Sequence, residues 1–238
     1  TTDTGTIQAS DIKILDGFTT GEVGIPVTVA TISGTFADIT DVIDLEGTNG
    51  VIDNDVTDRS VVADSHTSMA LTVTDAITVA QANQLVTEMD KGFVTATISD
   101  GDITTLITTG NSYDPGTGAV AQVGLNSTAG AHAAGQIFNI TLTDASVTAA
   151  NLNELDTRTA GTITVGGSTN ITGDYTAPTD LEDVFASTGI TGISTVSSTA
   201  AASVAQVNNI IAKTTAVVTG TVNDKTLAGL AGLTGTGN

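Results

Sequence analysis

The chain of 238 residues contains no cysteine and no tryptophan, and only 3% of its residues are aromatic. Without cysteine, disulfide bonds and thiolate metal sites are excluded. A large secreted repeat protein folds without disulfides, so this absence does not decide the cellular compartment. Because large aromatic side chains are scarce, the core has to be thin and built from Val, Ile, Leu and Ala.

Basic residues are also scarce, with six Lys and Arg against 26 Asp and Glu and a formal net charge of −20. Phosphate backbones and anionic lipids repel such a chain, so we expect no nucleic-acid partner and no binding to a membrane surface. No apolar run approaches the roughly 18 residues of a membrane-spanning helix, which predicts no membrane insertion.

The composition is typical of secreted or salt-exposed proteins, whose acidic surface keeps them soluble. The chain opens TTDTGT without Met, which indicates a processed start or an excerpt of a longer protein. We therefore expect an extracellular or cell-surface location.

The sequence repeats itself. Residues 93–110 (FVTATISDGDITTLITTG) restate residues 27–47 (VTVATISGTFADITDVIDLEG), and VAQANQL at 79–85 matches VAQVNNI at 204–210. Each copy joins an alternating run to apolar residues at helical spacing, the pattern of a strand followed by a helix. Repeats of this kind predict stacked units that bury their apolar faces only against their neighbours.

About seven strand-helix coils of about 25 residues are expected, within the range of known repeat units. Strands joined by helical crossovers are parallel, so the sequence predicts an α/β solenoid, with a right-handed parallel β-helix as the alternative. Residues 1–238 form one domain in this interpretation, with edge insertions at about 51–69 and 111–136. The expected strands are 27–33, 70–75, 93–99, 137–144, 162–165, 193–196 and 217–222. The expected helices are 7–16, 36–45, 78–90, 102–109, 148–156, a segment starting near Pro178, 203–213 and 226–233.

Short polar side chains stand where several of these helices begin. Such a side chain accepts a hydrogen bond from an unpaired N–H of the first helical turn, so we predict helix caps and no catalytic role. The predicted caps are Asp38, Asp102, Asp180 and Thr226. Asparagine recurs at one helix position, and we expect it to bond to neighbouring backbone at Asn83, Asn153 and Asn208.

One loop spaces its carboxylates as a hard cation requires. Asp53, Asp55 and Asp58 in VIDNDVTD are candidate calcium ligands, although neither the glycine nor the distal glutamate of an EF-hand is in register. A solvated acidic loop is the alternative, and the sequence favours it. His66 and His132 have no metal-ligand spacing around them and are expected to be exposed loop residues.

Catalytic motifs are missing. Neither GxSxG nor GxxxxGK[ST] occurs. A parallel β-helix polysaccharide lyase or hydrolase would need paired acids or a basic residue in a cleft. The basic residues are scattered singly, so we expect no enzyme: they are Lys13, Arg59, Lys91, Arg158, Lys213 and Lys225.

The repeated helix (VAQANQL, AANLNEL, VAQVNNI), with its TxTx strand and D-[I/L]-x-x-[L/V] helix, carries a family resemblance. It resembles repeats in giant, acidic, Thr/Ala/Gly/Asp-rich extracellular proteins of bacteria, notably cyanobacteria. The resemblance covers most of 78–238 and more loosely 7–47, and implies a section of a surface-layer, filament or adhesin protein. The calcium-binding GGxGxDxxx nonapeptide of such proteins does not occur here.

We therefore expect a non-enzymatic extracellular structural protein that self-assembles into, or decorates, a surface layer or filament. Leu227, Leu230 and Leu233 run nearly to the last residue, and neither terminus resembles a polar cap. This predicts that the module continues in a longer chain or stacks head to tail as a homo-oligomer or polymer. The alternative is an adhesin or phage-fibre-like module whose insertions bind a glycan or another cell-surface ligand, although few aromatic residues are present for sugar stacking.

Overall fold

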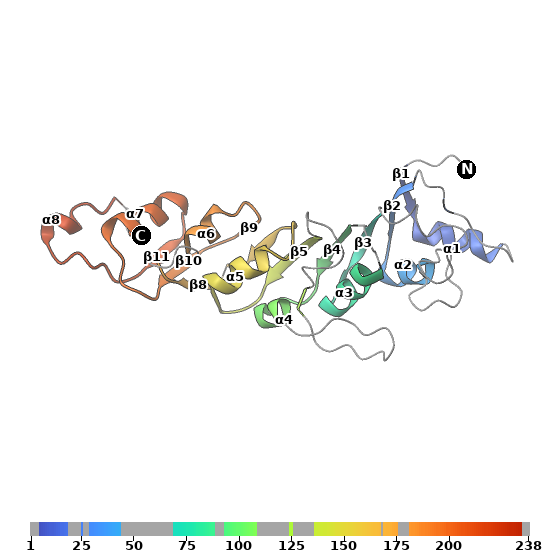
Figure 1. Cartoon of the computed structure of the whole chain (residues 1–238), viewed down its shortest axis with the longest axis horizontal. Coiled ribbons are helices and arrows are strands. Elements are labelled where there is room, and N and C mark those ends of the chain that lie inside the picture. Colours follow the sequence, from blue (N-terminus) through green and yellow to red (C-terminus); the bar gives the residue numbers. More distant parts are fainter. Residues whose placement is uncertain are drawn as a thin grey trace.

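The molecule is elongated, and its strands follow one another along the long axis in nearly the order of the sequence (Figure 1). The structure, a computed structural model, describes residues 5–18, 25, 29–43, 69–88, 93–108, 124–125, 136–167, 169–175 and 181–234. Every strand pair among these residues is parallel, which confirms an α/β fold built from parallel strands.

Two parallel sheets run along the molecule. The long sheet has seven strands in the order β1-β2-β3-β4-β5-β7-β9, and the short sheet has four in the order β11-β10-β8-β6. The strands of the long sheet are β1 (Gly5–Gln8), β2 (Val29–Gly34), β3 (Ala70–Ile77), β4 (Val94–Ile98), β5 (Ile137–Leu142), β7 (Ile163–Val165) and β9 (Ile190–Thr191). Those of the short sheet are β6 (Ser146–Thr148), β8 (Asn170–Gly173), β10 (Thr195–Ser198) and β11 (Val217–Thr219).

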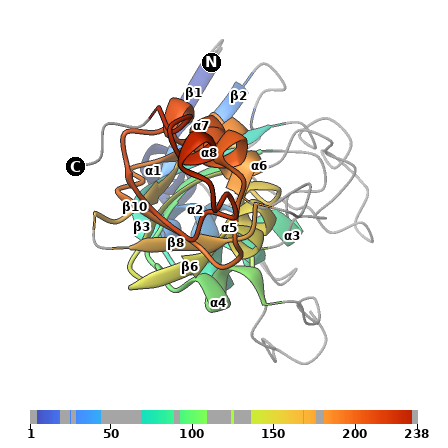
Figure 2. The ribbon, with the colours of Figure 1, turned by 90° about the vertical axis from the view of Figure 1, so that its left-hand side faces the viewer.

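Short helices connect the strands. Helix α1 packs on α2, and α4, α5, α6 and α7 pack on one another in order; α7 and α8 face the viewer in the end-on view (Figure 2). The helices are α1 (Ala9–Gly17), α2 (Phe36–Val42), α3 (Val79–Glu88), α4 (Ile103–Ile107), α5 (Ala149–Asp156), α6 (Leu181–Ala186), α7 (Val204–Lys213) and α8 (Leu227–Leu230).

The core consists of aliphatic residues aligned by the strand register. In the long sheet Ile140 pairs with Ile163 and Ile163 with Ile190, and each of the three is at most 8% exposed. In the short sheet Ile171 lies beside Val196, and both are buried. We call such a row of residues, aligned across neighbouring strands, a file. Because alternate residues of a strand point to opposite faces, this register places all the aliphatic residues of a file on the core side of the sheet. The expected core of Val, Ile, Leu and Ala is confirmed among the described residues, with Met69, Phe138 and Tyr175 as its other buried apolar members.

Four strands lie where the sequence predicts none: β1, β6, β8 and β9. β1 overlaps the start of the helix expected at 7–16, and the other three lie between expected elements or at their edges. Each is at most four residues long, so its alternating pattern is too brief to detect.

The predicted helix caps divide into two groups. Asp102 accepts a hydrogen bond from Thr105 N, and Thr226 accepts one from Gly229 N, as predicted. The prediction for Asp38 is wrong, because α2 begins earlier and Thr35 is its cap, accepting from Asp38 N at 3.1 Å. Asp180 lies outside the described residues.

Candidate functional site

Four aspartates interlock successive strand-helix units. Asp75 lies within β3, and the other three follow a strand; each accepts a hydrogen bond from the first backbone N–H of the helix in the preceding unit. Because helix N-termini carry orphan N–H groups and a partial positive charge, a carboxylate there is stabilising. The four bonds are Phe36 N to Asp75 Oδ1 (2.8 Å), Val79 N to Asp100 Oδ2 (2.7 Å), Ile103 N to Asp144 Oδ2 (2.9 Å) and Val204 N to Asp224 Oδ2 (3.1 Å).

These interlocking aspartates (Asp75, Asp100, Asp144 and Asp224) account for part of the acidic composition. Their role is not among the sequence-based predictions, although an aliphatic residue, a polar residue and an aspartate recur in order, as in Leu142-Thr143-Asp144. Their oxygens bond to backbone, which assigns them to the scaffold.

Arg158 makes a second structural connection. Its side chain is 6% exposed, and its guanidinium donates to the carbonyl oxygens of Leu106, Ile107 and Leu125 as well as to Glu154 Oε1. The first two carbonyls lie at the C-terminal end of α4, where backbone oxygens have no partner within the helix. The guanidinium therefore closes α4 and ties it to α5.

The exposed ion pairs are also structural. Lys13 Nζ on α1 lies 2.8 Å from Asp38 and 2.7 Å from Asp41, both on α2. The hydrogen bond from Lys13 is the main cause that lowers the pKa of Asp38, and the same bond raises the pKa of Lys13. At Asp102 the Thr104 hydroxyl, and after it the Thr105 N–H, hold the pKa of the carboxyl below its ordinary value.

The candidate calcium ligands Asp53, Asp55 and Asp58, and both histidines, His66 and His132, lie outside the described residues. Within the described ranges, no three carboxylates or imidazoles come together as a metal site would require.

The recurring asparagines behave as predicted at two positions. Asn83 Nδ2 donates to the carbonyl of Gly124 at 3.0 Å, and Asn208 Nδ2 donates to that of Gly232 at 2.8 Å.

Large exposed apolar side chains gather at the two ends of the molecule. The α1 patch lies at one end, and the α8 patch lies at the other (Figure 1). Phe18 is 85% exposed and Leu227 is 87% exposed, the highest values among the described large apolar residues. Between the ends, Ile137 is the one such residue in the described ranges, at 39%. The α1 patch is Ile14, Leu15 and Phe18, and the α8 patch is Val217, Leu227, Leu230 and Leu233.

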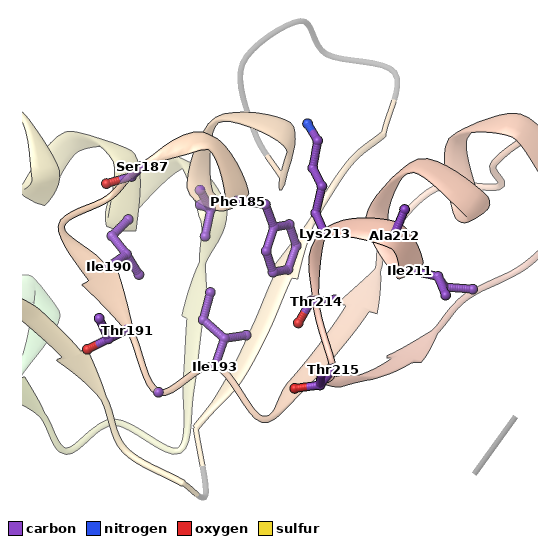
Figure 3. Close-up of a pocket in the computed structure, with 12 residues that line it drawn as sticks. Phe185, Ser187, Ile190, Thr191, Ile193, Ile211, Ala212, Lys213, Thr214 and Thr215 are labelled. Atoms are coloured by element: carbon purple, nitrogen blue, oxygen red, sulfur yellow. The ribbon is translucent and has the colours of Figure 1, made fainter. Parts of the chain in front are cut away.

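A hollow of about 570 Å³ lies beside β9, the last strand of the long sheet. Phe185, Ile190 and Ile193 line one side and Thr214 the other, with Lys213 at the rim (Figure 3). Lys213 is the only charged residue in its lining. The lining therefore mixes apolar side chains with hydroxyl and backbone polar groups, and it lacks the paired acids of a hydrolytic site.

The hollow exists because one connection is short. Eight residues (187–194) join α6 to β10, and they include β9. Only three residues (214–216) join α7 to β11. The second connection is too short to lay another strand on the long sheet, so the position next to β9 stays unfilled.

No described helix has both the length and the apolar character that crossing a membrane would require. No protein-family model, curated protein or solved structure matches the chain.

Proposed function

We propose that the chain is a non-enzymatic structural module that assembles end to end into an extracellular surface layer or filament. The observation that carries this proposal is the position of the exposed apolar residues, which lie almost entirely at the two ends of an elongated body. A stack of units leaves its end units uncovered, and an apolar end is stable in water only when it is covered.

The architecture in this proposal is an α/β solenoid. Supporting it, partner residues in neighbouring strands are 22 to 27 positions apart in most pairs, for example Ile171 and Val196. The steps from Ile32 to Leu71 and from Ile98 to Ile140 are longer, at 39 and 42, and contain the expected insertions. From β5 onward, units contribute strands to both sheets, as in the alternative, a parallel β-helix.

The non-enzymatic assignment is supported by the engagement of charged groups in structure. The interlocking aspartates bond to helix N-termini, and Arg158 bonds to three carbonyl oxygens. The extracellular assignment is supported by the net charge of −20 and by the resemblance to acidic bacterial surface proteins.

The test is sedimentation velocity at rising protein concentration, with negative-stain imaging of the same samples. Wild-type chains are expected to form linear multimers. Phe18→Glu on α1 and Leu227→Glu on α8 should each remove them, because a charge in the contact cannot be desolvated cheaply. Thr141→Glu is the matched control, since Thr141 is exposed on a central strand of the long sheet, away from both ends. A wild type that sediments as a monomer throughout would contradict the proposal.

Repeating the imaging with calcium and then with a chelator tests the acidic loop. Multimers that disappear in chelator would support calcium binding by Asp53, Asp55 and Asp58. Multimers that are indifferent to both additions would support the solvated loop.

A second candidate function is glycan or cell-surface binding by the two insertions. Its support is the length of the two long register steps, which exceed the other steps by more than ten residues. Binding on a glycan array that disappears when 51–68 or 111–123 is deleted would favour it, and an array without signal would count against it.

A further inference from the structure

We propose that the hollow beside β9 receives strand β1 of a second copy of this chain, so that the long sheet continues from one molecule into the next. This inference rests on the proposed end-to-end assembly and specifies its contact.

The first support is the open edge of β9. Ile163 N donates to the carbonyl of Gly189 at 2.9 Å, so the backbone of residue 189 faces β7. Successive residues of a parallel strand direct their N–H and C=O groups to opposite sides. The N–H and C=O of Ile190 therefore point away from β7, toward the hollow, and are placed to pair with an incoming strand.

The second support is the identity of the other free edge. The long sheet ends at β9 on one side and at β1 on the other, and all its strands are parallel. When two copies stack in the same orientation, β1 of one copy lies beside β9 of the other and runs parallel to it, as all strands of the long sheet do. Ile7 of β1 is half-buried in the aliphatic file of its own copy, and seated beside Ile190 it would extend the file of the neighbour.

The third support is the shape of the two ends. At the α8 end the short sheet has one strand, β11, beyond the last unit that contributes to the long sheet. At the α1 end β1 to β4 belong to the long sheet, and the short sheet begins only at β6. Strand β11 of one copy therefore projects toward the α1 end of the next copy, where the short sheet of that next copy has no strand.

Charge favours the same partner. Within the described ranges Lys213 and Lys225 take part in no ion pair, whereas Lys13 and Arg158 are both paired. Helix α1, which follows β1 directly, carries Asp11 and Asp16 on exposed positions. When β1 of one copy lies in the hollow of the next, the acidic helix α1 of the first copy comes to the end of the second copy that carries Lys213. The opposite charges of these two groups favour the encounter.

Engineered cysteines test the contact cleanly because the chain has none of its own. With Ile7 beside Ile190, Gln8 of one copy lies next to Thr191 of the other, about 5 Å away and within disulfide reach. Both positions are exposed, and the Gln8 side chain makes no capping bond. The double variant Gln8→Cys/Thr191→Cys should form a ladder of disulfide-linked multimers on a non-reducing gel. A mixture of the two single variants should stop at dimers.

The matched control is Gln8→Cys/Thr141→Cys. Thr141 aligns with Thr164 and Thr164 with Thr191 on the same face of the sheet. Thr141 therefore lies two strands, or about 10 Å, inside the edge and beyond disulfide reach. This variant should remain monomeric on the same gel, and circular dichroism should show that both variants are folded.

The outcomes separate the two proposals. Multimers in sedimentation without the Gln8–Thr191 cross-link would overturn the β1 contact and leave end-to-end assembly standing. Absence of both multimers and cross-links would overturn both. Equal cross-linking in the control would also overturn the stated register. Lys213→Glu should reduce the yield of the ladder at low salt, and the reduction should shrink at 1 M salt, where charges are screened.

Discussion

Replacing Asp144 with alanine should destabilise the protein by about 1–2 kcal/mol. The carboxylate accepts the Ile103 N–H at 2.9 Å in a partly buried position at the start of α4. A hydrogen bond to a charged group contributes about 1.5–3 kcal/mol, and a carboxylate near a helix N-terminus adds about 0.3–1 kcal/mol when exposed. The loss is smaller than their sum, because water reaches the freed N–H and Asp102 still caps the helix.

Two further variants sharpen this prediction. Asp144→Asn keeps an acceptor oxygen but removes the charge, so it should lose about half as much stability. Asp16→Ala is the control, since Asp16 is exposed in the last turn of α1, where a negative charge opposes the helix dipole. Its effect should remain within about 0.5 kcal/mol of zero.

Urea unfolding monitored by circular dichroism, together with hydrogen exchange of the Ile103 amide, would measure the effect. Exchange at Ile103 should accelerate by about tenfold in Asp144→Ala, since each 1.4 kcal/mol corresponds to that factor. If Asp144→Ala and Asp16→Ala gave the same stability and the same exchange rate at Ile103, the interlocking role of the aspartate would be refuted.

Three other variants test separate features. Because hydrogen bonds from Thr104 and Thr105 lower the pKa of Asp102, its contribution to stability is present above about pH 4 and is lost as the pH falls through the lower folded-state pKa. Asp102→Asn should therefore flatten the acid limb of a stability-against-pH curve, and an unchanged limb would contradict this. Arg158→Ala should cost about 3 kcal/mol in urea unfolding by leaving the carbonyls of Ile107 and Leu125 without a donor, whereas the Leu106 carbonyl still accepts from Leu125 N; a cost under 1 kcal/mol would show that water replaces the guanidinium. The Tyr175 hydroxyl is buried and has no hydrogen-bond partner among the described residues, so Tyr175→Phe should raise the melting temperature, and a clear fall would reveal a partner for the hydroxyl.

Periodicity alone predicts much of the architecture. The aliphatic positions of the expected strands near residues 94–98 and 137–142 became the aligned files of the long sheet, because alternation decides which face is buried. The short strands β6 and β8 escaped detection, since each buries mainly one aliphatic residue, Val147 or Ile171.

The candidate site was predictable only in part. Leu227, Leu230 and Leu233 at the end of the chain indicate an apolar end, and the structure leaves all three exposed. The hollow lies where the long sheet has no strand beside β9, and periodicity detects only strands that are present. The cue to the hollow is the length of the connections: three residues follow α7, whereas eight follow α6.

The interlocking aspartates also bear on the order in which the chain becomes stable during synthesis. The hydrogen-bond acceptor of the Phe36 N–H is Asp75, 39 residues later in the chain, and that of the Ile103 N–H is Asp144, 41 residues later. A chain emerging from the ribosome thus presents each of these helices before the carboxylate that completes it has been made. A newly made helix lacks this N-terminal hydrogen bond until the next unit has been synthesised. The units therefore become stable in the order in which they are made.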